Sequence, residues 1–116
     1  HNFVSIGSMA LIAEAAAHAA DAGVDPTIFV DVLASGGGAG AALQRVSPFI
    51  TEADASNVPF TITNALKDIS YYGEMAEAAG ASRFIADGVQ EAIGLACTEA
   101  GDTAYIPELV KLFRKA

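Results

Sequence analysis

Residues able to do chemistry gather in one stretch of the sequence, around Lys67 and Asp68. If this stretch is a helix, one polar face carries Asn64, Lys67, Asp68 and Tyr71, opposite an apolar stripe. An aromatic residue, Phe60, comes just before it. A lysine beside a carboxylate in apolar surroundings is typical of a binding or catalytic site. A solvated polar face without a function explains the same residues about equally well, so both interpretations stay open at this point.

The composition favours helices as the elements that position this polar face. Alanine is the commonest residue, only 4 prolines occur, and β-branched residues form few runs. A chain of 116 residues is long enough to bury one hydrophobic core without a metal or a disulfide. We therefore expect a single all-α domain, folded as a compact bundle of about six helices.

Cap and stop signals divide the chain into these helices. We expect helices over about residues 1–22, 26–35, 41–50, 60–79 and 82–100, and a last one with Pro107 in its first turn. Asp25 is the expected N-cap of the second helix and Ser82 that of the fifth. Pro48 should kink or end the third helix. Glycines should end three of the helices, at Gly23, Gly80 and Gly101.

The apolar periodicity predicts which side chains face the core. The second helix should contribute Ile28, Phe29, Val32 and Leu33. The fifth helix should contribute Phe84, Ile85, Val89, Ala92, Ile93 and Ala96. The first helix carries many small residues, so we expect other helices to pack closely against more than one of its sides.

The charge pattern argues against several classes of partner. The net charge is −8, and no lysine or arginine occurs before Arg45, so we expect no nucleic-acid binding. Lys111, Arg114 and Lys115 lie near the C terminus, where cations complement the dipole of a final helix. The longest stretches without an acidic residue, lysine or arginine, residues 1–13 and 32–44, are shorter than the roughly 20 residues of a membrane span. We therefore expect no transmembrane helix.

Two candidate sites are given structural interpretations. Cys97 is the only cysteine and is expected to fill space in the core; its being alone fits a reducing cytoplasm. Glu14 and His18 are four residues apart on a helix, and two such residues do not make a metal site, so we expect no bound metal.

The glycine-rich residues 36–40 follow no strand and precede no lysine. A tight connection between helices is therefore favoured there over a phosphate-binding loop.

The order of these signals resembles a known family. The chain shows Asn2-Phe3, then Ala10 to Ala15 (ALIAEA), Ala22 to Pro26 (AGVDP), the glycine-rich break, Phe60, and Leu66-Lys67-Asp68-Ile69. This series covers nearly the whole chain and resembles the C-terminal helical domain of the β-hydroxyacid dehydrogenases, a family that includes 3-hydroxyisobutyrate dehydrogenase and 6-phosphogluconate dehydrogenase. The opening HNFVSIG lacks a starting Met and a basic segment, so we expect a fragment and not a signal peptide.

The resemblance implies a two-domain parent enzyme. Its N-terminal Rossmann domain, missing from this chain, would hold NAD or NADP, while residues 1–116 would close the active site and form a homodimer. The family moves a hydride between the nicotinamide and the carbinol carbon of a small β-hydroxyacid. The fragment alone should therefore be inactive.

The resemblance also implies roles for four residues. Asn2 matches the second Asn of the family's Lys-x-x-Asn-Asn motif and would position the catalytic lysine, which lies upstream, and the substrate; His1 stands where the first Asn usually is. Lys67 corresponds to a lysine that reaches the cofactor near its nicotinamide. Asp68 corresponds to an acid that orders this corner of the substrate pocket, and it is also able to hold Lys67. Phe60 corresponds to an aromatic residue at the pocket's edge.

Two other classes of protein fit the composition. A free-standing helical interaction module, dimerising through its first helix and without catalysis, is the main alternative. A small helical carrier of an apolar ligand is the other, but it needs a closed apolar cavity, whereas alanine-rich stripes predict tight packing.

Overall fold

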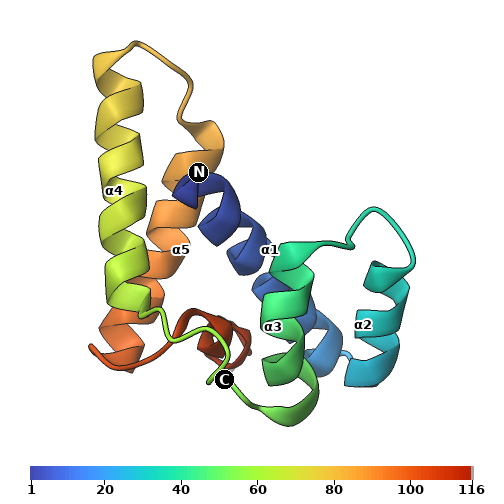
Figure 1. The fold of residues 1–116 in the computed structure, drawn as a ribbon. Helices are drawn as coiled ribbons and strands as arrows, with labels where there is room; N and C mark the ends of the chain where they lie inside the picture. Colours follow the sequence, from blue (N-terminus) through green and yellow to red (C-terminus); the bar gives the residue numbers. More distant parts are fainter. Residues whose placement is uncertain (116) are drawn as a thin grey trace.

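The computed structural model describes residues 1–115, and within them the chain is all-α (Figure 1). The elements are α1 (Asn2–Asp21), α2 (Pro26–Ala34), α3 (Ala41–Glu52), α4 (Ile62–Ala78), α5 (Phe84–Ala100), the 3-10 turn η1 (Ile106–Glu108) and α6 (Leu109–Leu112). The predicted fold class and the number of helices are confirmed for these residues, and most boundaries agree within two residues.

Helix α1 lies at the centre of the bundle and contacts every other helix. Helices α4 and α5 form an antiparallel pair on one side of it, while α2 and α3 lie on the other side (Figure 1). The η1–α6 segment packs against α1 as well. The expectation that α1 is packed on more than one side is therefore confirmed.

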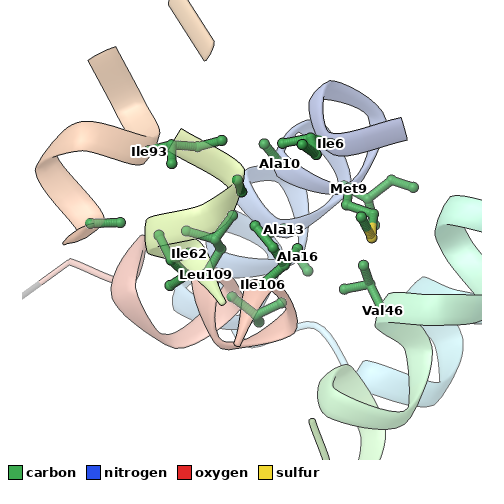
Figure 2. Close-up of a cluster of buried hydrophobic side chains, with 14 of the residues drawn as sticks. Ile6, Met9, Ala10, Ala13, Ala16, Val46, Ile62, Ile93, Ile106 and Leu109 are labelled. Carbon is green, nitrogen blue, oxygen red and sulfur yellow. The ribbon is translucent and has the colours of Figure 1, made fainter. Parts of the chain in front are cut away.

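The hydrophobic core forms around α1 (Figure 2). Its buried members in α1 are Ile6, Met9, Ala10, Ile12, Ala13, Ala16 and Ala17. Larger side chains come from the surrounding elements: Val46, Ile62, Ile69, Ile93, Ile106 and Leu109. Because the buried face of α1 is half alanine, neighbouring helices come close to its backbone and their bulky side chains fill the space.

One expectation about α1 is corrected. By length and composition this helix is apolar enough to cross a membrane. The expectation counted only unbroken uncharged stretches, which end at Glu14, although a membrane span tolerates one or two charges. Core helices of globular proteins pass the same test, and seven residues of α1 are buried against other helices, so the observation is weak evidence for a membrane.

The predicted cap and stop residues act as expected at α2 and at three glycines. Asp25 Oδ1 accepts a hydrogen bond from the backbone N–H of Thr27 at 2.8 Å, and Pro26 is the first helical residue. Gly23, Gly80 and Gly101 all adopt positive φ angles, where a side chain would be strained. The local sequence therefore decides where these helices begin and end.

Two predicted core faces are wrong in part. In α2, Ile28 and Val32 are 58% and 65% exposed, and only Phe29 and Leu33 pack against the core. In α5, Ala86, Ile93 and Ala96 are buried and Val89 packs against the core, while Phe84 and Ile85 are 89% and 74% exposed. The reason is position: α2 lies at the edge of the bundle, and Phe84 and Ile85 lie in the first turn of α5. The apolar periodicity shows which residues share one face of a helix, but it does not show how far the neighbouring helices extend to cover that face.

Two local expectations are also corrected. Helix α5 begins at Phe84 with Arg83 as its N-cap and no capping side chain, so Ser82 does not cap it. Pro48 lies inside α3 and does not end it, because the helix continues to Glu52. Phe49 and Ile50 pack against the core, which holds the last turn of α3 in place after the proline.

We predict that Ile69→Ala lowers the free energy of unfolding by about 2–5 kcal/mol, because Ile69 is fully buried and the substitution leaves a cavity. Ile28→Ala is the matched control: it removes the same atoms from a side chain that is 58% exposed, and it should change stability by less than about 0.5 kcal/mol. Urea unfolding of both variants tests this. Equal losses would contradict the core described here.

Candidate functional site

A hydrogen bond joins the start of α1 to the second turn of α4. Asn2 Nδ2 donates to Asp68 Oδ2 at 2.8 Å, although the two residues are 66 positions apart in sequence. A carboxylate acceptor makes this a charge-assisted bond, stronger than one between neutral groups. The structure therefore brings together two of the four predicted site residues, which define a polar corner.

The other end of the Asn2 amide is also occupied. Asn2 Oδ1 accepts a hydrogen bond from His1 Nδ1 at 3.1 Å, with the ring tautomer that carries a proton on that nitrogen. Asp68 accepts from the nitrogen of the amide and His1 donates to its oxygen, so the amide cannot rotate by 180° without losing both bonds. One N–H of Asn2 Nδ2 is left to face a ligand. Nothing in the sequence analysis predicted this role for His1.

An aromatic pair lies beside the polar corner and was also missed. The rings of Phe3 and Tyr72 stack with their centroids 4.2 Å apart and their planes 21° apart. Phe3 follows Asn2 in α1, and Tyr72 lies one turn after Asp68 in α4, so the two contacts are adjacent along both helices. Phe3 and Tyr72 both fit the apolar periodicity of their helices, and that is the only sequence signal for their meeting.

Lys67 is adjacent to Asp68 in sequence but does not pair with it. Its side chain is exposed, and the ion pairs found within residues 1–115 do not include it. Successive residues on a helix point about 100° apart, so Asp68 turns toward α1 while Lys67 turns to solvent. The expectation that Asp68 is able to hold Lys67 is therefore wrong in this structure, and the lysine charge stays available to a ligand.

Phe60 lies before α4 and not at its start. The helix begins at Ile62, and Thr61 caps it by accepting a hydrogen bond from the backbone N–H of Asn64 at 3.1 Å. Phe60 is partly buried against the core, and its carbonyl accepts a hydrogen bond from the backbone N–H of Ile106 at 2.9 Å. No interaction found within residues 1–115 links Phe60 to Asn2 or Asp68, so the structure does not bring it into the polar corner.

The polar corner is an open surface and not a closed pocket. An apolar groove of about 520 Å³ lies between α1 and α5. Neither Asn2 nor Asp68 lines it, but Phe3, which follows Asn2, does. Residues 1–115 contain no group of three or more His, Cys, Asp or Glu side chains placed to hold a metal ion. The corner thus presents one amide and one half-buried carboxylate, while the neighbouring Lys67 is exposed and points to solvent.

Comparison with protein families identifies the class of molecule to which this domain belongs. A family model described as the NAD-binding domain of NADP-dependent 3-hydroxyisobutyrate dehydrogenase matches residues 1–113. The chain therefore belongs to the NAD(P)-dependent hydroxyacid dehydrogenases, a family of oxidoreductases, and specifically to its 3-hydroxyisobutyrate dehydrogenase-like NAD-binding domains. A search among curated proteins found no match.

Among the described residues, Lys67 is the one whose charge and exposure fit an NAD(P) cofactor. Lys67 offers a cation that no carboxylate neutralises, suited to a dinucleotide that carries negative charge. The glycine-rich residues 36–40 connect two helices and follow no strand, so they do not form the usual dinucleotide phosphate turn. This domain would therefore contact one part of the cofactor.

We predict that the Phe3–Tyr72 stack contributes about 0.5–1.5 kcal/mol to stability beyond the area it buries. A double-mutant cycle with Phe3→Leu and Tyr72→Leu, measured by urea unfolding, gives the coupling energy directly. Tyr71→Leu is the control, because Tyr71 is 59% exposed and should not couple to Phe3. Additive effects of Phe3→Leu and Tyr72→Leu would contradict the stacked arrangement.

Proposed function

We propose that this chain is the helical C-terminal domain of an NAD(P)-dependent dehydrogenase of small β-hydroxyacids, similar to 3-hydroxyisobutyrate dehydrogenase. It would cover the active site formed with an N-terminal Rossmann domain and build a homodimer. The observation that carries the proposal is the Asn2–Asp68 hydrogen bond, because it unites two separate parts of the family pattern in one corner. The match over residues 1–113 supports the same family and disfavours an unrelated interaction module.

In this proposal Asn2 orients the reacting groups. When bound, NAD(P) exchanges a hydride with the carbinol carbon of the substrate. Asp68 and His1 fix the Asn2 amide, so its remaining N–H points in one direction. This N–H would donate a hydrogen bond to an oxygen of the substrate or help to position the catalytic lysine. That lysine would lie upstream of His1, and it would take or return the proton of the substrate hydroxyl.

Lys67 would contact the cofactor, and Asp68 and Phe60 would border the substrate. The exposed ammonium of Lys67 extends on a flexible stem and is attracted to the negative charge of the dinucleotide. The Phe60 side chain, held in place through its backbone by Ile106, would form an apolar edge at the mouth of the pocket. The isolated chain should be inactive, because the catalytic lysine and the phosphate-binding turn belong to the other domain.

The groove between α1 and α5 is the surface we assign to the homodimer. Its rim exposes four apolar side chains to more than half of their area: Val4, Leu11, Phe84 and Ile85. Only one charged residue, Glu14, lines it in a chain whose net charge is −8. A second copy is therefore repelled little at this face, and apolar area of this kind is typical of dimer interfaces. A cytoplasmic location fits the lone Cys97.

We predict that Lys67→Ala raises the KM for NAD(P) of the full-length enzyme by about 10- to 100-fold, because one contact between charged groups is worth about 1.5–3 kcal/mol. The fold should be unchanged, since Lys67 is exposed. Lys115→Ala is the control, with the same loss of charge at a distant place. An unchanged KM in the Lys67 variant would remove Lys67 from the cofactor site.

We predict that Leu11→Glu converts the dimer into a monomer, because it buries a charge in an apolar interface. Sedimentation of the variant measures this. Val32→Glu is the matched control: Val32 is 65% exposed against 72% for Leu11, but it lies on α2, away from the groove. If both variants stay dimeric, the interface lies elsewhere.

A further inference from the structure

A second cavity lies at the opposite end of α1 from the polar corner. It has a volume of about 280 Å³ and is lined by ten apolar residues from α1, α2, α3 and α6 and the segments next to them, among them Ala20, Phe29, Ile50 and Val110. Because a helix rises about 1.5 Å per residue, Ala20 is about 27 Å from Asn2 along α1. This cavity is therefore distinct from the site proposed above.

The charged residues that line this cavity are both cations. Lys111 and Arg114 form one wall, and no acidic residue is among the twelve that line it. The chain has 14 acidic and only 6 basic residues, so two basic side chains at one apolar cavity are a marked local reversal of charge. Cations near the end of a helix are stabilised by its dipole, but this effect does not explain why Lys111 and Arg114 border a cavity.

Arg114 is held in a defined orientation. Its Nε donates to Asp21 Oδ1, and Asp21 Oδ2 accepts a hydrogen bond from the backbone N–H of Lys115 at 3.0 Å. The Lys115 bond and the Arg114 side chain keep the pKa of Asp21 below its usual value, so Asp21 stays ionised at neutral pH. Asp21 is only 15% exposed and is thus fixed at the end of α1.

This orientation leaves the outer fork of the guanidinium available. Arginine has five N–H donors, and Asp21 uses the one on Nε. Among residues 1–115, no hydrogen bond or ion pair was found at the two terminal nitrogens of Arg114. Two parallel N–H groups at that end match the two oxygens of a carboxylate. Lys111 adds a second positive charge on the same wall.

We propose that this cavity binds a small carboxylate with an apolar body, its head on Arg114 and Lys111 and its chain among the side chains of α1, α2 and α3. The apolar walls exclude ligands that are charged throughout, such as phosphates or nucleotides. The cavity is just below the size range of drug-like pockets, which limits the ligand to a short chain. The proposal does not depend on the dehydrogenase assignment.

The test uses the 116-residue chain and sodium hexanoate, followed by amide chemical shifts. We expect saturable shifts in residues 16–24, 49–53 and 110–114, and weaker binding of 1-hexanol and hexylammonium, which share the chain but lack the carboxylate. Equal binding of hexanol would show apolar adsorption only and would overturn the proposal. Shifts confined to Asn2 and Asp68 would also overturn it, because the carboxylate would then occupy the polar corner.

Three single substitutions test the contribution of each cation to hexanoate binding. Arg114→Gln and Lys111→Gln should each weaken hexanoate binding about tenfold, the loss expected for one charge-assisted contact. Lys111→Gln leaves the Asp21–Arg114 pair intact, so its effect cannot come from a displaced C-terminal segment. Lys115→Gln is the matched control, because its side chain does not line the cavity and only its backbone contacts Asp21. Equal affinity in all three variants would contradict the proposed role of the two cations.

Discussion

The close packing of α1 against all the other helices is the constraint on which this structure depends. A helix with bulky side chains on several faces would hold its neighbours apart, whereas the alanines of α1 let their backbones approach. Most of the large core side chains come from the surrounding elements, notably Ile62, Ile69, Ile93 and Leu109, beside Ile6, Met9 and Ile12 of α1. The core thus combines an alanine-rich central helix with bulky side chains from its neighbours. A substitution that enlarges a buried side chain of α1 would therefore displace several elements at once.

The same arrangement positions the polar corner. Packing fixes the start of α1 relative to α4, and the segment before α4 is tied to the C-terminal part of the chain by hydrogen bonds from Ile62 N to Ala104 O and from Ile106 N to Phe60 O, both 2.9 Å. With both helices fixed, the Asn2–Asp68 bond and the Phe3–Tyr72 stack join two surfaces that are already in place. A side chain positioned in this way loses little entropy when it binds a ligand.

Charge is distributed unevenly over the domain, and this separates its surfaces. The groove between α1 and α5 is nearly free of charged side chains, an exposed lysine lies next to the polar corner, and two cations line the cavity at the other end of α1. On a chain with a net charge of −8, these differences in charge are the reason why we propose a different kind of partner for each surface: another apolar face, a dinucleotide, and a small carboxylate. One helix links all three, because α1 contributes residues to each.

The sequence by itself determined the fold class, most helix boundaries and the pairing of Asn2 with the Lys67-Asp68 stretch. Caps and glycine stops are local, since Asp25 and Gly101 act on their own neighbours in the chain, and so they can be read from single residues. The resemblance to the family assigned both Asn2 and Asp68 to the surroundings of one substrate, and this is the basis for expecting them near each other. Only the tertiary structure decided that Asp68 turns to Asn2 and not to Lys67, that Phe60 packs on the core, and that Ile28, Val32, Phe84 and Ile85 face outward. Exposure depends on where neighbouring helices end and on the direction of each side chain around its helix, and neither is encoded in the apolar periodicity of one segment.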